Sequence, residues 1–425
     1  MPRDSRIIPI TAASPAPARC VPSGTFASSA ATTAGLAAPP PLALYVHWPW
    51  CVKKCPYCDF NSHEAKADID EAAYLAALIA DLEAALPQIW NRPVMSIFIG
   101  GGTPSLMRAE TADALLAAIR MRVSLHADAE ITLEANPGTA EADKFRGFRE
   151  AGVNRLSLGI QSFNDEKLKA LGRIHDSREA RLAIDLALTH FSRVNIDLMY
   201  ALPQQSFTEA ERDIDTAIAS GASHLSAYHL TLEPNTPFHH MPPPLPDDDI
   251  AADMQEMIEA KLAVADFIHY ETSAFAKTGE QCRHNLNYWA FGDYLGIGAG
   301  AHSKLSNHLE IWREARHRHP RAYMQGATHS NFMGTRQTIS AADLPGEFMM
   351  NALRLTNGFP LRLFTERTGL PLATIEKSAL AARREGLLEL VEKEMIEKEI
   401  AEKILRPTQQ GQRFLNQLLA RFLAD

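Results

Sequence analysis

The stretch that decides the fold is Cys51-Val-Lys-Lys-Cys55-Pro-Tyr-Cys58, which comes shortly after the apolar run Leu42–His47. The chain of 425 residues contains five cysteines, and three of them lie in this stretch. That is too few and too clustered for a disulfide scaffold. Thiolates are soft ligands that suit an iron–sulfur cluster or zinc. The spacing therefore predicts a metal centre held by Cys51, Cys55 and Cys58.

The thiol spacing by itself leaves the kind of metal open. A structural zinc needs four ligands, and His47 or His63 lies close enough in the sequence to supply one. A cubane cluster held by three cysteines instead leaves one iron open to a small ligand, whereas a four-cysteine site mainly transfers electrons.

Beyond Leu42, apolar β-rich runs alternate with helical patterns. Strands are expected at Leu42–His47, Met95–Ile99, Glu130–Ala135, Arg155–Ile160, Val194–Ala201 and His224–Leu232. Helices are expected at Asp70–Leu86, Glu110–Arg120, Glu141–Glu150, Ser177–His190, Thr208–Ser220 and Asp247–Ala265. Repeated strand–helix units predict parallel strands with helical crossovers. The fold class is therefore α/β, a partial (β/α)6 TIM-like barrel whose site lies at the C-terminal ends of the strands.

The two ends of the chain differ from this body. Ala, Pro, Ser and Thr make up 26 of residues 1–40, which favours a disordered tail that includes Cys20 over an organelle transit peptide. Residues 41–304 are expected to form the barrel domain with an extension, and residues 305–425 a helix-rich C-terminal domain. Two short apolar runs there, Leu387–Val391 and Ile404–Leu405, suggest a wing-like hairpin.

Charge and hydropathy narrow the range of partners. Lys and Arg number 42 and Asp and Glu number 51, which gives a net charge of −9. An acidic chain is not built to coat nucleic acid. Because no apolar run is long enough to cross a bilayer, we do not expect an integral membrane protein.

Polar side chains follow or interrupt the expected strands at one edge. They are found in Gly100-Gly101-Gly102-Thr103-Pro104 after the second strand, Glu134 and Gln161 at the ends of the third and fourth, Arg173 beyond the fourth, and Asp197 within the fifth. A polar residue in such a place faces a site or is satisfied by a buried partner. Each of these residues taken alone favours the second role, a polar side chain satisfied inside the fold. Because they all fall at the same edge as the cysteines, together they predict a shared ligand.

In its place and spacing, the cysteine motif resembles that of the radical S-adenosylmethionine (SAM) enzymes, with the aromatic Tyr57 just before the last cysteine. The resemblance implies a [4Fe-4S] cluster whose open iron binds the amino and carboxylate groups of SAM. It also implies that SAM is contacted by Tyr45, Tyr57, Gly101, Gly102, Thr103, Glu134, Gln161, Arg173 and Asp197.

Further segments resemble the branch that contains oxygen-independent coproporphyrinogen III oxidase (HemN) and its relatives. Tyr45-Val-His-Trp-Pro-Trp-Cys51 and Glu347-Phe-Met-Met-Asn-Ala-Leu-Arg-Leu355 match that branch, and the resemblance covers roughly residues 41–425, which makes the C-terminal domain HemN-like. The oxidase carries a fourth cysteine two residues after the third, whereas this chain has Phe60. This departure argues against decarboxylation of coproporphyrinogen.

The segment Cys282-Arg-His284-Asn-Leu-Asn-Tyr288-Trp289, together with Cys58-Asp-Phe-Asn-Ser62, resembles the HemW-type heme chaperones. In that family the histidine of the motif is implicated in heme binding, so the resemblance makes His284 the expected heme ligand. Cys282 is a rival ligand. The residues without the resemblance favour a core histidine beside packed aromatic rings.

These observations lead to an expected function with two alternatives. We expect a heme chaperone that binds heme, a [4Fe-4S] cluster and SAM, and delivers heme to respiratory hemoproteins at the cytoplasmic membrane. It would be cytoplasmic and would reach the membrane through those partners. The alternatives are an oxygen-independent coproporphyrinogen III oxidase, which acts by radical decarboxylation, and a zinc-bound structural domain.

Overall fold

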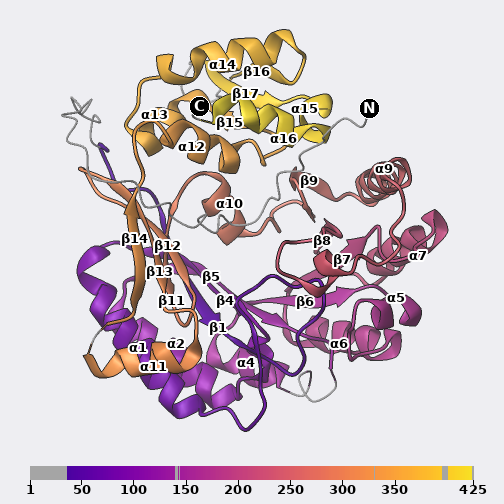
Figure 1. The fold of residues 1–425 in the computed structure, drawn as a ribbon, viewed down its shortest axis with the longest axis vertical. Coiled ribbons are helices and arrows are strands. Elements are labelled where there is room, and N and C mark those ends of the chain that lie inside the picture. Colours follow the sequence, from indigo (N-terminus) through magenta and orange to yellow (C-terminus); the bar gives the residue numbers. More distant parts are fainter. Residues whose placement is uncertain (1–35, 139–141, 143, 330, 395–400, 424–425) are drawn as a thin grey trace.

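The computed structural model describes residues 36–425 except 139–141, 143, 330, 395–400 and 424–425. The expected tail, with Cys20, lies almost wholly outside the described residues, as does the start of the helix expected at Glu141–Glu150. One twelve-stranded sheet runs through the molecule (Figure 1) in the order β14-β13-β12-β11-β1-β4-β5-β6-β7-β8-β10-β9. Its strands are β1 (Leu42–Trp48), β4 (Val94–Gly101), β5 (Leu125–Ala135), β6 (Arg155–Gln161), β7 (Arg193–Tyr200), β8 (His224–His229), β9 (Ile268–Glu271), β10 (Ala274–Ala276), β11 (Asp293–Ile297), β12 (His302–Ser306), β13 (Ile311–Arg316) and β14 (Met333–Thr338).

The six strands expected from the sequence are neighbours in this sheet. From β1 to β8 they pair in parallel and in chain order. The connecting helices are α1 (Glu71–Ala85), α2 (Ala109–Arg122), α4 (Phe145–Ala151), α5 (Asp165–Ala170), α6 (Ser177–His190) and α7 (Phe207–Ala219), and α9 (Asp248–Val264) follows β8. Because β14 and β9 stand at opposite ends of the strand order, the barrel is open, which confirms the predicted partial barrel.

Local sequence explains why these units form. The parallel strands carry fully buried apolar side chains, such as Val46 and Ile97, as expected for a sheet that is covered by helices. Helix α6 starts at a capping box in which Asp176 and Glu179 satisfy each other's backbone N–H groups, and α7 starts in the same way at Ser206. The sequence therefore marks the starts of α6 and α7, whereas β5 begins five residues before the expected Glu130 and β8 ends three residues before the expected Leu232.

Between Ala265 and Thr338 the structure has strands that the sequence analysis did not assign, two of them beyond residue 304. β11 pairs in parallel with β1, and β12, β13 and β14 continue the sheet as antiparallel neighbours. These strands are five or six residues long. Every residue of β14 is exposed, so it lacks the apolar alternation that reveals a strand in a sequence.

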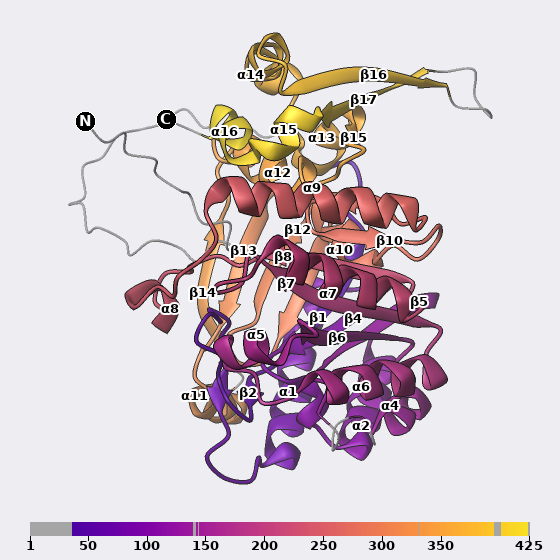
Figure 2. The same ribbon diagram turned by 90° about the vertical axis from the view of Figure 1, so that its right-hand side faces the viewer.

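The C-terminal part is helical, with a small three-stranded sheet (Figure 2). Its elements are α12 (Leu344–Ala352), β15 (Phe359–Pro360), α13 (Leu361–Thr368), α14 (Ala373–Arg384), β16 (Leu388–Glu394), β17 (Ala401–Pro407), α15 (Gln409–Arg413), α16 (Leu415–Leu419) and the 3-10 turn η4 (Ala420–Phe422). β16 and β17 pair antiparallel, with Leu390 opposite Leu405, so the expected hairpin is present. The division of the chain at residue 304 stays a prediction.

Two large apolar cores, with two small clusters beside them, organise the described residues. The larger core fills the space between the sheet and its outer helices. The second core joins Phe291 and Ile311 of the barrel part to Phe348, Phe359 and Phe364 of the C-terminal part. Short elements complete the chain: β2 (Trp50–Cys51), β3 (His63–Glu64), η1 (Leu86–Gln88), η2 (Pro104–Leu106), α8 (Pro237–His240), α10 (Arg283–Trp289), α11 (Pro320–Gly326) and η3 (Ala327–His329).

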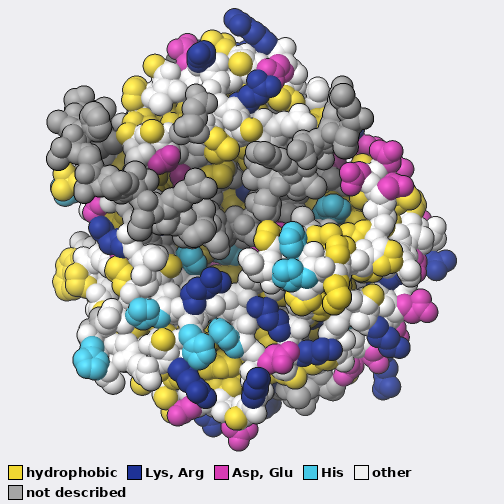
Figure 3. Space-filling view, in the orientation of Figure 1, with side chains coloured by type: hydrophobic (Ala, Val, Ile, Leu, Met, Phe, Trp, Pro, Cys, Tyr) yellow, Lys and Arg dark blue, Asp and Glu magenta, His cyan; other side chains and the backbone are white. Residues whose placement is uncertain are grey.

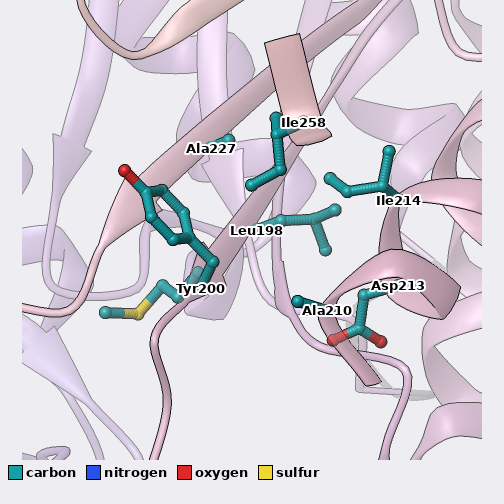
Figure 4. A pocket seen from close by; sticks show the side chains of 8 residues that line it. Leu198, Tyr200, Ala210, Asp213, Ile214, Ala227 and Ile258 are labelled. Carbon is teal, nitrogen blue, oxygen red and sulfur yellow. The ribbon is translucent and has the colours of Figure 1, made fainter. Parts of the chain in front are cut away.

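A small cavity lies between the outer face of the sheet and its helices (Figure 4). It is lined by Leu198 and Ala227 from β7 and β8, and by Ile214 and Ile258 from α7 and α9. Because alternate side chains of a strand point to opposite faces, Leu198 points away from the face that carries Asp197. The cavity is therefore a packing gap behind the sheet and lies apart from the candidate site.

Among the described residues, no helix is long and apolar enough to cross a membrane.

Candidate metal and cofactor site

The three clustered cysteines lie on the loop that leaves the C-terminal end of β1. The short parallel pairing of β2 with β3 closes this loop. Lys54 makes three hydrogen bonds within the loop. Its Nζ donates to the carbonyl oxygens of Phe60 (2.9 Å) and Ser62 (3.3 Å), and its backbone N–H donates to Glu64 Oε1 (3.0 Å). The loop that carries the thiols is therefore held by its own hydrogen bonds.

The loop also makes hydrogen bonds to the segments that follow β11 and β13. Asn61 Nδ2 donates to the carbonyl oxygens of Ala299 (2.9 Å) and Arg318 (2.8 Å). The rings of His63 and His319 lie 5.4 Å apart. Figure 3 shows histidine and basic side chains interspersed over the lower half of the face seen in Figure 1.

The spacing of the thiols tests which metal they fit. All four described cysteines are free. Among the described residues, one group of three His, Cys, Asp or Glu side chains has ligand atoms within 4.8 Å of one another. That group is Glu130, Cys282 and His284, which lie outside this loop. A tetrahedral zinc with Zn–S bonds of about 2.3 Å needs its ligands about 4 Å apart. The sulfur atoms of Cys51, Cys55 and Cys58 are not all within 4.8 Å of one another, which a single tetrahedral ion would require.

Two of the clustered thiols, Cys51 and Cys58, have raised pKa values because they are buried. Burial raises the pKa of Cys58 to about 11, although the backbone N–H of Phe60 partly offsets this. Burial also raises the pKa of Cys51, with an opposing hydrogen bond from Thr103. Because a metal binds the thiolate, metal binding here must release protons.

The turn Gly101-Gly102-Thr103 at the end of β4 is hydrogen-bonded to the start of the cysteine loop. The backbone N–H groups of Gly102 and Thr103 donate to the carbonyl oxygens of Trp48 and Trp50, both at 2.7 Å. A Cβ atom on Gly102 would lie 2.5 Å from the Trp50 oxygen. Gly101 has a φ of +116°, a conformation that favours glycine. This turn therefore needs glycines in order to approach the loop so closely.

Glu134 ends β5 beside that turn. Its Oε2 accepts the backbone N–H of Gly101 at 3.0 Å. Burial and the nearby charge of Asp197 raise the pKa of Glu134 to about 7, against the opposing effect of the Gly101 N–H. A carboxyl group poised near neutrality in a buried place is typical of a ligand site.

Asp197 lies deeper along the same face, on β7. It accepts hydrogen bonds from Ser157 Oγ (3.0 Å) and Asn195 Nδ2 (2.8 Å). Burial raises its pKa, and these hydrogen bonds lower it in part. Sequence reasoning selected Asp197 but missed Ser157 and Asn195, the side chains that hold it.

Arg173 connects the cysteine loop to β6. Its Nη1 lies 3.7 Å from Cys55 Sγ, and its Nη2 donates to Gly159 O (2.7 Å) and Asn136 Oδ1 (2.6 Å). Asn136 in turn donates to Thr103 Oγ1 at 3.0 Å. One chain of contacts therefore links the expected SAM residues Arg173 and Thr103.

The remaining expected SAM residues lie around the same edge. Gln161 ends β6 with a φ of +69°, at an irregularity in the pairing with β7. The ring of Tyr57 lies 6.4 Å from that of Phe238. Tyr45, on β1, shares a 2.8 Å hydrogen bond between its hydroxyl and His47 Nδ1, and burial holds its pKa well above the usual value. That these residues contact SAM stays a prediction.

His284 lies inside the fold, on α10, which Figure 1 shows between the barrel strands and the C-terminal helices. It is only 5% exposed. Its ring centre lies 4.1 Å from that of Phe98 of β4, with the two rings tilted by 34°, and Phe98 stacks in turn on Tyr45 at 6.0 Å. The expected heme ligand and one expected SAM contact are therefore separated by a single aromatic ring.

The structure adds a residue near His284 that the sequence reasoning missed. Glu130 Oε1 of β5 lies 3.2 Å from His284 Nδ1, and Cys282 Sγ lies 2.9 Å from the same nitrogen. Glu130 Oε2 forms an ion pair with Arg193 Nη1 at 2.9 Å. The alternation of Glu130, Thr132 and Glu134 along β5 places three polar side chains on one face, and this was the available signal.

Burial and charge set the ionisation of this pair. Burial lowers the pKa of His284, although Glu130 opposes the shift, so the imidazole is neutral. Burial would raise the pKa of Glu130, but the His284 hydrogen bond and the charges of Arg155 and Arg193 bring it well below its usual range. The site therefore pairs a carboxylate with a neutral histidine.

Comparison with known proteins places these features in a family. Residues 45–217 match the radical SAM superfamily and residues 339–414 match the HemN C-terminal domain. The fold is similar to that of coproporphyrinogen III oxidase (HemN) from Escherichia coli, with a TM-score of 0.74, 22% identity and 90% of each chain covered.

Two curated relatives are much more similar in sequence. The chain is 47% identical over 391 residues to heme chaperone HemW of Escherichia coli and 45% identical over 393 residues to heme chaperone HemW of Haemophilus influenzae. Each alignment covers 91% of this chain and 99% of the relative. The chain therefore belongs to the HemW family within the radical SAM superfamily.

Proposed function

We propose that the chain is a heme chaperone that holds a [4Fe-4S] cluster and SAM at the C-terminal edge of the barrel and binds heme through His284. Membership of the radical SAM superfamily implies the cluster and SAM. Cys51, Cys55 and Cys58 would hold the cluster and leave one iron open. When bound, the cluster supplies one-electron chemistry toward SAM.

The charges around the edge support the SAM part of the proposal. SAM carries an amino group and a sulfonium, both cationic, and one carboxylate. Glu134 and Asp197 offer carboxyl groups, and Arg173 offers a buried guanidinium beside Cys55. Tyr45, Tyr57, Gly101, Gly102, Thr103 and Gln161 complete the proposed contacts.

The observation that carries the heme part is the neutral His284 in the motif at the start of α10. A neutral imidazole is a common axial ligand of heme iron. Two aromatic rings lie next to it, Phe98 tilted at 4.1 Å and Tyr288 edge-on at 6.1 Å. The names of the HemW relatives support the assignment of heme as the ligand.

The destination of the heme extends the proposal. Delivery to respiratory hemoproteins at the cytoplasmic membrane requires a donor whose ligand bond is reversible. A single histidine on a short seven-residue helix fits a site that gives up its heme. Cytoplasmic residence, with membrane contact only through those partners, belongs to the same proposal.

The central experiment is heme titration followed by the Soret absorbance. We expect the wild-type chain and the exposed control His240→Ala to bind equally, and His284→Ala to bind at least tenfold more weakly, because the axial ligand is gone. Cys282→Ala tests the rival ligand and should keep most of the affinity. Equal binding by wild type and His284→Ala would remove His284 from the proposal.

The competing function is oxidative decarboxylation of coproporphyrinogen. The HemN C-terminal domain match at residues 339–414 favours a porphyrin-related role, whereas Phe60 occupies the place of the oxidase's fourth cysteine. Anaerobic incubation of the reconstituted protein with coproporphyrinogen III, SAM and a reductant should give no protoporphyrinogen. Turnover in this assay would replace the chaperone proposal by the enzyme.

A further inference from the structure

Arg354 is a half-buried arginine whose charge no carboxylate neutralises. It follows α12, in the segment Glu347–Leu355 that the proposed function leaves without a role. Its Nε is buried without a hydrogen-bond partner, and Arg354 forms no ion pair with any described residue. By contrast, the buried Arg316 pairs with Asp81 at 2.8 Å. Arg354 therefore differs from an arginine that serves only to hold the fold together.

A second unsatisfied donor lies next to Arg354. The Cζ atom of Arg354 lies 4.4 Å from the centre of the Trp289 ring, so the guanidinium packs over the indole at the end of α10. The indole Nε1–H of Trp289 is also buried without a partner among the described residues. Packing on an aromatic face holds the planar guanidinium and leaves its edge free for a ligand. Two neighbouring donors without an acceptor indicate an acceptor that the chain itself does not supply.

The groups that act electrostatically on Arg354 leave its charge unpaired. Burial lowers the pKa of Arg354, against the opposing effects of Glu271 and Tyr228. Glu271 is buried, and its carboxylate accepts the backbone N–H of Ser273 at 3.3 Å but forms no ion pair with Arg354. A trapped water molecule would satisfy the two donors but would carry no charge. A carboxylate ligand would accept both hydrogen bonds and also neutralise the guanidinium.

The neighbourhood of Arg354 is open on the side of the candidate site. Tyr228, which acts on Arg354, lies two residues after Ser226 on β8, and Ser226 pairs in register with Asp197. Alternate residues of a strand share a face, so Tyr228 lies on the face that carries Asp197. Tyr228 is 41% exposed, so this face is open to solvent at the end of β8. Arg354 therefore borders the edge at which the proposed ligands would bind.

We propose that Arg354 and Trp289 form a carboxylate site that binds one propionate group of heme. This inference rests on the proposed function for the identity of the cargo, but it is independent of which side chain ligates the iron. Heme carries two propionates at one edge of an apolar ring. The guanidinium would bind one of them through two parallel N–H···O bonds, and the indole Nε1–H offers a further donor. The site would thus recognise the carboxylate edge of the cargo.

The test compares heme with heme dimethyl ester, in which both propionates are blocked. The proteins are wild type, Arg354→Met and the control Arg384→Met, which removes an exposed arginine of the same C-terminal part that has no ion pair among the described residues. We expect wild type and Arg384→Met to prefer heme over the ester by about tenfold, and Arg354→Met to lose this preference, because a charged hydrogen bond is gone. The same preference in all three proteins would overturn the inference.

Two further measurements separate this site from iron ligation and from folding. Protoporphyrin IX has the propionates but no iron, so Arg354→Met should weaken its binding by a similar factor, and unchanged binding would overturn the inference. Without ligand, Arg354→Met should resist urea at least as well as wild type, because it lacks an unpaired charge. A less stable variant would instead give Arg354 a structural role and overturn the inference. If wild type binds no heme, the proposed function itself fails.

Discussion

At the scale of single residues, the candidate site combines soft thiols with buried carboxyl groups of unusual pKa. Cys51, Cys55 and Cys58 are held by a closed loop, and Arg173 reaches Cys55 from β6. Burial raises the pKa of Glu134 to about 7, so its ionisation changes near neutral pH. Each of these properties leads to a measurement.

The first prediction concerns the cluster. Substitution of Cys55 by Ala removes one of the three proposed cluster ligands. After anaerobic reconstitution, the iron and sulfide content should therefore fall far below the about four irons and four sulfides per chain expected for one cubane. Cys282→Ala, which removes a buried thiol elsewhere, should reconstitute like wild type. The measurement is iron and sulfide analysis after desalting. One tightly bound zinc without iron in the wild type would contradict the assignment.

The second prediction concerns the pH dependence of stability. The pKa of Glu134 is raised to about 7 from an ordinary 4.5. The folded state therefore binds the proton of Glu134 more tightly than the unfolded state does. Proton binding by Glu134 thus stabilises the fold at low pH, and this stabilisation is lost as the pH rises from about 4.5 through about 7. At pH 8 we expect Glu134→Gln to unfold with a free energy about 2–3 kcal/mol higher than wild type, and at pH 5 the gain should be much smaller.

Urea unfolding at the two pH values measures this difference. Glu150→Gln is the matched control, because the Glu150 side chain is 70% exposed and its charge is screened by solvent. It should change stability little at either pH. A gain in Glu134→Gln that is the same at pH 5 and pH 8 would show that Glu134 is not the titrating group.

At the scale of elements, the turn after β4 and the loop after β1 form one unit. The Gly102 and Thr103 N–H groups bond to carbonyl oxygens on either side of Pro49, just before the first cysteine. The first turn of α10 is likewise held by Glu130 of β5. Elements far apart in the chain thus position each expected ligand residue.

We expect Gly102→Ala to weaken cluster retention. Its Cβ would lie 2.5 Å from the Trp50 carbonyl oxygen, so either the turn or the start of the cysteine loop must shift. Less than half of the wild-type iron should remain after desalting. Gly221→Ala is the control, because no atom lies within 4 Å of its Cβ and its φ of +83° costs only about 1 kcal/mol. Equal iron in both variants would contradict this account.

At the scale of the whole molecule, the barrel and the C-terminal part have separate apolar cores that meet near β13 and α10. Phe348 of α12 lies at the centre of the second core, with its ring 5.6 Å from Phe291, 5.0 Å from Phe359 and 5.3 Å from Phe364. The cysteine loop has no part in that core.

We therefore expect Phe348→Ala to loosen the C-terminal part and to leave the cluster in place. Loss of a fully buried Phe costs about 3–5 kcal/mol, whereas Phe414→Ala, at a site 46% exposed, should cost far less. Limited proteolysis should cut Phe348→Ala faster beyond residue 340, with cluster absorbance like that of wild type. Loss of the cluster in Phe348→Ala would show that the two parts are coupled.

The sequence alone determined the features that local patterns encode. Apolar runs and caps specify the six parallel strands and their helices, and ligand spacing specifies the cysteine loop, because each depends on residues close together in the chain. The resemblance of short motifs then selected Glu134, Gln161, Arg173 and Asp197.

Only the tertiary structure decided how these parts meet. Arg173 and Cys55 are 118 residues apart, and Glu130 and His284 are 154 residues apart, so no local pattern signals either contact. The same holds for β11, which extends the sheet beside β1 although its sequence lies far beyond the six-strand repeat. Such contacts form because folding buries polar groups that must then find partners, and the fold determines which distant residues are within reach.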